Sequence, residues 1–285
     1  MNRHSFGGFP PTSVDRAWYG VQAPEGSSVG DQLKFQFVHD FHNTLGDVRL
    51  LFMPDGADTT TNSDLGVDGV TWTYDATVAG NLTRLGSGMY WSTDGTADEA
   101  DTPDDTRHSF GDSTLDGPFS VGALVRVTAG TVVQDILSKY SAATGAELRE
   151  WRFGIDASEF LFLECWDESA NAAIGRRFAT ALAVDTWMLV VGVYRGTRVA
   201  DGIDLYLYDG TTRAVVDNTD QNTLTYVAME NLTSVTKLAS SQGASAITGF
   251  WAGDIAMVWL TASAPTSSAL WAIRSLVNSY FDLNV

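Results

Sequence analysis

The stretch LREWRFGIDASEFLFLECWDE, residues 148–168, contains two runs of alternating apolar and polar side chains around a short turn. Alternation with a period of two is typical of a β-strand with one buried face, so the stretch predicts a β-hairpin. The predicted inner face carries Trp151, Phe153 and Ile155, with Arg149 beside them, and then Leu161, Leu163 and Cys165. The predicted outer face carries polar and aromatic side chains, namely Glu150, Arg152, Glu164 and Trp166.

Similar runs follow one another along the chain at intervals of about 10–15 residues, separated by Gly, Asp and Asn turns. They include FSVGALVRV (119–127), VVQDILSKY (132–140), WMLVVGVYR (187–195), IDLYLYDG (203–210) and GDIAMVWL (253–260). LKFQFV (33–38) alternates too and is also predicted as a strand. Closely spaced strands of this kind favour a sandwich or barrel over βαβ units. The predicted fold class is therefore all-β.

The C-terminal segment APTSSALWAIRSLVNSYFDL, residues 264–283, predicts a helix. Ser263 is its candidate cap, and Pro265 suits the first turn. The residues at helical spacing form one apolar stripe, made of Leu270, Ile273, Val277 and Tyr280. We expect this helix to close one end of the sandwich.

Residues 1–47 are predicted to be an N-terminal arm, and residues 48–285 a single domain. The first 30 residues are rich in Gly, Pro and Ser, which predicts an extended segment. A merely solvated tail rarely carries four aromatic residues. The arm is therefore predicted to anchor the chain to neighbouring subunits through Phe6, Phe9, Trp18 and Tyr19.

The composition excludes several classes of function. The chain has 35 acidic and 17 basic residues, a formal net charge of −18, which disfavours binding to nucleic acid or to anionic membranes. Cys165 is the only cysteine, so an intrachain disulfide and a cysteine-based metal cluster are excluded. The first residues lack the apolar run of a secretory signal peptide, which predicts synthesis in the cytosol.

The order of the strand segments resembles the laminin-G-like branch of the concanavalin-A-like lectin/glucanase superfamily. The matching stretches are FSVGALVRV, ILSKY followed by LREWRFGID, WMLVVGVYR leading to IDLYLYDG, and FWAGDIAMVWL followed by a helix. The likeness covers roughly residues 48–285 and implies a two-sheet antiparallel jelly-roll sandwich with one concave sheet. Together with the expected lack of secretion, it further resembles the jelly-roll proteins on the virions of tailed viruses (phages).

A glucanase of this superfamily would carry the acids of an E-x-D-x-x-E motif on one strand. Retaining glycosidases need two carboxyl groups about 5–5.5 Å apart. The sequence lacks the motif, and in its closest approach, Glu164-Cys-Trp-Asp167-Glu168, Glu164 and Asp167 fall on opposite strand faces. The protein is therefore predicted not to be an enzyme.

Many domains of this superfamily hold a structural calcium ion, and this chain has two Asp-rich loops. Its candidate ligands are Asp55, Asp58, Asp94 and Asp98. The late strand of the family often reads G-x-I-D-E-V, and here Ala256 stands where that acid would sit. Solvated, turn-forming aspartates are the favoured interpretation, and no cofactor is expected.

Lectin-like sites stack aromatic rings on sugars and contact hydroxyls with carboxylates or arginine. Glu150, Arg152, Glu164, Trp166, Tyr206 and Tyr208 could form such a surface if their strands are neighbours in the concave sheet. An outer face covered by another subunit is the alternative. The chain is predicted to be a non-enzymatic virion protein that decorates the capsid or belongs to the tail, with capsid or tail proteins as its partners. Adhesion to glycans is predicted as a second role. A homo-oligomer is also expected, and the resemblance suggests a trimer. A soluble carbohydrate-binding module and, behind it, a divergent glycoside hydrolase are the alternatives.

Overall fold

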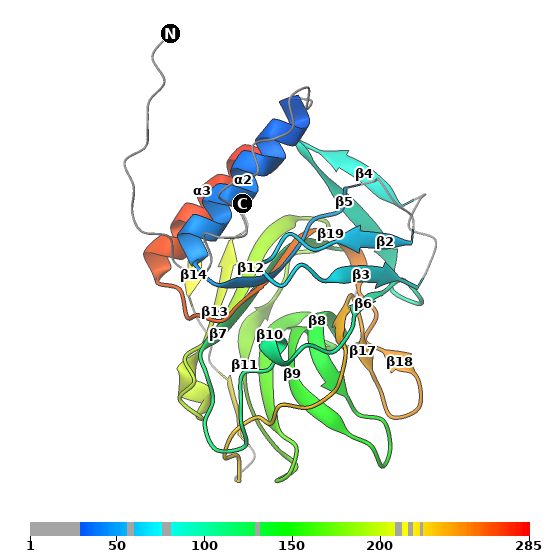
Figure 1. The fold of residues 1–285 in the computed structure, drawn as a ribbon, viewed down its shortest axis with the longest axis vertical. Coiled ribbons are helices and arrows are strands. Elements are labelled where there is room, and N and C mark those ends of the chain that lie inside the picture. Colours follow the sequence, from blue (N-terminus) through cyan, green and yellow to red (C-terminus); the bar gives the residue numbers. More distant parts are fainter. Residues whose placement is uncertain are drawn as a thin grey trace.

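The computed structural model describes residues 29–55, 60–75, 81–128, 132–208, 213–215, 219–222 and 225–285. Two largely antiparallel sheets are stacked in a jelly-roll-like sandwich, and two helices lie against one of them (Figure 1). The predicted all-β sandwich with a C-terminal helix is confirmed. The four aromatic residues of the predicted arm lie outside the described residues, as does Asp58.

The eight-stranded sheet carries both helices. Its spatial order is β14 (Arg213–Val215), β13 (Ile203–Tyr208), β12 (Trp187–Tyr194), β7 (Phe119–Val127), β19 (Ala252–Thr261), β5 (Gly88–Asp94) and β4 (Leu82–Leu85), and β1 (Val48–Phe52) pairs with β19. The central strands β12, β7 and β19 are almost continuously buried, because one of their faces meets the other sheet and the opposite face meets the helices.

The eleven-stranded sheet contains the hairpin predicted for residues 148–168. Its spatial order is β15 (Thr219–Asn222), β11 (Ala172–Ala181), β10 (Phe160–Asp167), β9 (Leu148–Ile155), β8 (Gln134–Ser141), β16 (Thr236–Leu238), β6 (Ala100–Thr102), β3 (Thr71–Tyr74) and β2 (Thr61–Ser63). The short strands β17 (Ser241–Gln242) and β18 (Ile247–Thr248) form a hairpin that joins at β8. The predicted hairpin is β9–β10, with Trp151 opposite Cys165.

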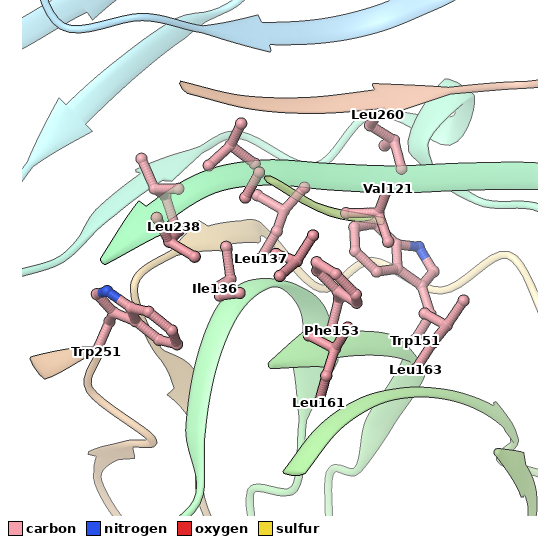
Figure 2. Close-up of a cluster of buried hydrophobic side chains, with 14 of the residues drawn as sticks. Val121, Ile136, Leu137, Trp151, Phe153, Leu161, Leu163, Leu238, Trp251 and Leu260 are labelled. Carbon is pink, nitrogen blue, oxygen red and sulfur yellow. The ribbon is translucent and has the colours of Figure 1, made fainter. Parts of the chain in front are cut away.

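The main core lies between the two sheets. Trp151, Leu163 and Leu205 are buried there, at most 1% exposed, as the alternation predicted. Figure 2 shows Val121 and Leu260 of the eight-stranded sheet near the aromatic and aliphatic side chains of the eleven-stranded sheet. This packing fixes which face of β8, β9 and β10 points away from the core.

The second apolar cluster lies on the outer face of the eight-stranded sheet. The helices α2 (Val29–Leu45) and α3 (Ser267–Phe281) supply one side of it. The prediction of a strand over residues 33–38 is wrong. The buried side chains Phe37, Phe41 and Leu45 repeat every four residues, and this helical stripe over a longer segment outweighs six residues of alternation.

The C-terminal helix begins later than predicted and lies in a different place. Its cap is Thr266, whose Oγ1 accepts a hydrogen bond from the Ala269 backbone amide, so Ser263 and Pro265 precede the helix. The predicted apolar stripe is buried. Its side chains pack onto the outer face of the eight-stranded sheet rather than closing an end of the sandwich.

Candidate functional site

Tyr206 and Tyr208 do not share a surface with the other predicted sugar-contacting residues. They lie on β13 in the eight-stranded sheet, under the helices, and are 5% and 1% exposed. The ring of Tyr208 lies 6.1 Å from that of Trp271 on α3. The expectation of one surface fails because β13 belongs to the other sheet and its outer face is covered.

The prediction that Glu150 lies on the outer face of the sheet is also wrong. A β-bulge shifts the register so that Lys139 opposes Trp151 and Tyr140 opposes Arg149, which leaves Glu150 as the extra residue. Glu150 is fully buried, whereas Arg149 is only partly buried and faces outward with Arg152. The bulge therefore exchanges the predicted places of two neighbouring side chains.

The carboxylate of Glu150 forms a buried ion pair with Lys139. Their Oε1 and Nζ atoms are 2.9 Å apart, and neither side chain is exposed. The Lys139 ammonium also donates to Asp104 and to the backbone oxygens of Leu232 and Ser234, at 2.7, 2.9 and 2.7 Å. Burial raises the pKa of Glu150 to about 7, although Lys139 opposes this shift. Glu150 thus has a structural role.

Arg152 and Glu164 do meet on the outer face of the eleven-stranded sheet. The Nε of Arg152 donates to a Glu164 carboxylate oxygen at 2.7 Å. The Arg152 guanidinium carbon is 5.0 Å from the ring centroids of both Tyr140 and Phe162. Such contacts hold the guanidinium in one place, so Arg152 is a preorganised donor.

Trp166 lies on the same face as Arg152, but a cation already contacts its ring. The Arg149 guanidinium carbon is 4.2 Å from the ring centroid of Trp166, and Arg149 is in turn held by Glu168 at 2.6 Å. The rings of Trp166 and Tyr140 meet edge to face, 6.0 Å apart. The arginine therefore occupies ring surface that the predicted sugar stacking requires.

A pocket of about 440 Å³ opens beside Arg152, between β8 and the β17–β18 hairpin. Asp135 of β8 contributes a carboxylate, and Phe250 contributes a partly buried aromatic ring. Aromatic, carboxylate and guanidinium groups around one hollow are the elements of a site for a polar ligand with apolar faces. The pocket is lined by Gly95, Val132, Val133, Asp135, Arg152, Ser241, Ile247, Thr248, Gly249 and Phe250.

Asp135 is fully buried, and only one of its two carboxylate oxygens has a hydrogen-bond partner. Its Oδ2 accepts a hydrogen bond of 2.7 Å from the Ser241 hydroxyl, while its Oδ1 has no hydrogen-bond partner. Burial raises the pKa of Asp135 to about 6, against the opposing charge of Arg152. A buried acceptor without a donor costs stability, so its presence at a pocket is a sign of a functional site.

Gly249 is required by the close approach of the β17–β18 hairpin to Asp135. Its φ is +64°, and a Cβ there would lie 2.4 Å from Asp135 Oδ2. We expect Gly249→Ala to lower the free energy of unfolding by about 2–4 kcal/mol, from left-handed strain plus overlap. Gly145→Ala is the matched control, because its φ is +76° with open space around the Cβ. Urea unfolding measures both, and equal losses would contradict the overlap.

Three buried carboxyl groups make stability depend on pH. Burial raises the pKa of Asp64 and Asp135 to about 6 and that of Glu150 to about 7. Their stabilising contribution is complete below their unfolded pKa of about 4 and is lost as the pH rises through 6 to 7. We expect the free energy of unfolding to be larger at pH 5 than at pH 8, by about 1 kcal/mol or more.

Urea unfolding at the two pH values measures this difference. Glu150→Gln removes the group with the highest of the three pKa values and should flatten the profile. Stability that rises from pH 5 to pH 8 would contradict the expected trend.

The aspartates predicted as calcium ligands serve mainly to shape turns where they are described. Asp94 accepts hydrogen bonds from the backbone amides of Thr96 and Ala97, at 2.7 and 3.1 Å, and Asp98 accepts one from Asp94 at 2.9 Å. Hydrogen bonding to Thr96 lowers the pKa of Asp94. Asp55 is exposed and lies in a different part of the fold, next to α2 and β4.

Another acidic group in the described residues has a spacing that could suit a metal ion. Ligand atoms of Asp68, Asp105 and His108 all lie within 4.8 Å of one another. The Arg107 guanidinium bridges the two carboxylates, at 2.7 Å from each. Since this one cation already pairs with both carboxylates, the group forms an ion-pair network rather than an evident metal site.

The carboxylates of the segment closest to the glucanase motif, residues 164–168, also have structural roles. Asp167 accepts hydrogen bonds from the Val227 and Ala170 backbone amides at 2.7 and 2.9 Å. Glu168 pairs with Arg149, and Glu164 pairs with Arg152. These carboxylates hold loops and cations in place.

The residues of the pocket that were not predicted from the sequence are Asp135, Ser241, Gly249 and Phe250. One signal was present: VVQDIL (132–137) places a carboxylate within an apolar strand, which is unusual unless the group is paired or functional. The other three belong to a short hairpin, and no local pattern indicates that this hairpin lies against β8.

No protein-family model matches the sequence, and no curated protein matches it significantly. Solved structures do match it, at identities that show the fold alone. Domain 4 of AbnA, a GH43 extracellular arabinanase from Geobacillus stearothermophilus solved with arabinotriose, is 14% identical with a TM-score of 0.51. That match covers 80% of this chain and 98% of that domain.

Two further similar structures are larger than the chain described here. The binding domain of Paraclostridial Mosquitocidal Protein 1 is 10% identical with a TM-score of 0.55, covering 82% of this chain and 53% of that one. A Trypanosoma rangeli sialidase mutant displaying trans-sialidase activity is 12% identical with a TM-score of 0.51. That match covers 88% of this chain and 39% of the sialidase chain. The chain thus spans about half the length of the toxin domain and less of the sialidase. The jelly-roll-like β-sandwich of this chain is the fold that these matches share with it.

Among the described residues, no helix is both long enough and apolar enough to span a membrane.

Proposed function

We propose that the chain is a carbohydrate-binding module without catalytic activity, and that the pocket beside Arg152 holds a sugar residue. The observation that carries the proposal is the meeting of Asp135, Arg152 and Phe250 around one hollow on the outer face of the eleven-stranded sheet. Carboxylate and guanidinium groups bind hydroxyls, and an aromatic ring packs against the apolar face of a sugar.

The similar fold of the arabinanase domain solved with arabinotriose supports a carbohydrate ligand, although the identity of the sugar does not carry over. The face of the sheet supports the proposal too, because its arginines are fixed by Glu164 and Glu168 before any ligand arrives. Preorganised polar groups bind with a smaller loss of conformational entropy.

The absence of catalysis is part of the proposal. The carboxylate of Glu164 is paired with Arg152, and that of Asp135 accepts a hydrogen bond from Ser241 at the pocket floor. Neither arrangement resembles a pair of acids on either side of a scissile bond. A place on a virion, with capsid or tail partners and a trimeric state, stays a prediction from the resemblance.

A glycan array tests the proposal, followed by affinity electrophoresis through gels that contain arabinan, xylan, β-glucan or mannan. We expect retention by at least one glycan, and Phe250→Ala should weaken it about tenfold through the lost ring contact. Trp271→Ala, which removes a partly buried aromatic ring on α3, should leave retention unchanged. No retention by any glycan would overturn the proposal, and release of reducing ends would show an enzyme.

A further inference from the structure

The acceptor and donor groups of the pocket indicate what kind of sugar it fits. Asp135 Oδ2 is taken by Ser241, and Oδ1 is a buried acceptor without a donor. A carboxylate turns readily about χ2, whose preferences are broad, so one oxygen can keep Ser241 while the other meets a ligand at the pocket floor. The group that satisfies it must donate a hydrogen bond.

Arg152 supplies the complementary group beside this acceptor. Its Nε is used by Glu164, and among the described residues its Nη groups donate no hydrogen bond. Arg152 and Asp135 both line the pocket, and the charge of Arg152 opposes the rise in the pKa of Asp135. A hydroxyl both donates and accepts, so adjacent hydroxyls of one ring can donate to Asp135 and accept from Arg152.

The charges argue against an acidic sugar. Two carboxylates, Asp135 and Glu164, face one guanidinium, and Arg152 is already paired with Glu164. The chain as a whole carries a formal net charge of −18. A ligand carboxylate would meet Asp135 at close range with little positive charge left to offset the repulsion, and like charges brought together at a binding site are strongly unfavourable.

We infer that the Asp135–Arg152 pocket binds two adjacent hydroxyl groups of an uncharged sugar residue and rejects the corresponding uronic acid. The inference rests on the proposed function, because it names the class of sugar that the same site takes. Phe250 and Ile247 then contact the apolar face of the ring.

The test compares matched sugars by ligand-observed NMR titration of the full chain. The probes are the methyl glycosides of glucose, galactose and mannose, each with its uronic acid, and glucosamine. We expect at least one neutral glycoside to bind, and its uronic acid to bind at least about tenfold more weakly. A uronic acid that binds as tightly as its parent, or glucosamine that binds more tightly than glucose, would overturn the inference.

Variants locate the effect in the pocket. Asp135→Asn should weaken binding of the neutral glycoside about tenfold and narrow its advantage over the uronic acid. Asp101→Asn removes the same charge from a partly exposed side chain on β6, outside the pocket lining, and should change neither. If Asp135→Asn does not fold, Asp135→Ser replaces it in the same binding measurements. Thermal melts establish that each variant is folded.

The outcomes separate the two proposals. Glycan retention that persists unchanged in Asp135→Asn, or that favours acidic sugars, leaves the carbohydrate-binding function standing and removes the inference. Failure of every sugar and polysaccharide to bind removes both.

Discussion

Lys139→Met is expected to lower the free energy of unfolding by about 3–5 kcal/mol, because it strands the buried carboxylate of Glu150. Neither side chain is exposed, and the substitution also removes the donor to the Leu232 and Ser234 oxygens. Methionine fills much of the lysine volume, so the loss reports the removed charge and hydrogen bonds rather than a cavity. Urea unfolding monitored by circular dichroism measures it.

The double variant Lys139→Met with Glu150→Gln is the matched control. Glutamine keeps an acceptor for the Leu232 amide, which donates to Glu150 at 3.0 Å, but carries no charge. We expect it to recover a substantial part of the loss. The single variant should also lose less stability at pH 5 than at pH 8, because Glu150 takes up a proton when its cation is removed. Equal stability of the single and double variants at pH 8 would contradict this account.

Trp151→Ala is expected to lower the free energy of unfolding by about 3–5 kcal/mol, because it empties the centre of the core between the sheets. Trp151 is fully buried, its ring lies 5.8 Å from that of Phe119, and its Nε1 donates to the His108 backbone oxygen at 2.9 Å. The substitution therefore leaves both a cavity and a buried carbonyl without a donor.

Trp166→Ala, in the next strand of the same hairpin, is the comparison. Its ring is only partly buried and faces outward, so its loss should cost clearly less than the loss of Trp151. Trp151→Phe should fall between wild type and Trp151→Ala. Urea unfolding ranks the variants, and equal losses for the two alanine variants would contradict the assignment of inner and outer faces.

The inner faces of the strands could be predicted from the sequence because alternation depends only on which side of a strand is buried. Phe153, Leu161 and Leu163 are buried for this reason. Alternation failed at Glu150, where a bulge inserts one extra residue and reverses the faces beyond it. The sequence of β9 alone contains no signal of that bulge, because the register depends on the pairing with β8.

The candidate site was harder to predict than the fold because it combines segments that are far apart in the chain. Tyr206 fits an outward sugar-binding position as well as it fits a buried position under a helix, and only the tertiary structure distinguishes these. Asp135 and Ser241 are 106 residues apart, and their hydrogen bond depends on how the β17–β18 hairpin folds back. Sequence patterns identify faces of strands, whereas this pocket depends on which loop covers a face.

Under the proposed carbohydrate-binding function, the position of the two helices bears on how several copies would bind one long polysaccharide. Both α2 and α3, and with them Val285, pack on the eight-stranded sheet, on the side of the sandwich away from the pocket. Copies fixed to a common support at the start of α2 would therefore present their pockets outward. A polysaccharide spanning two such pockets would be held with an avidity well above the affinity of either one, without any new contact.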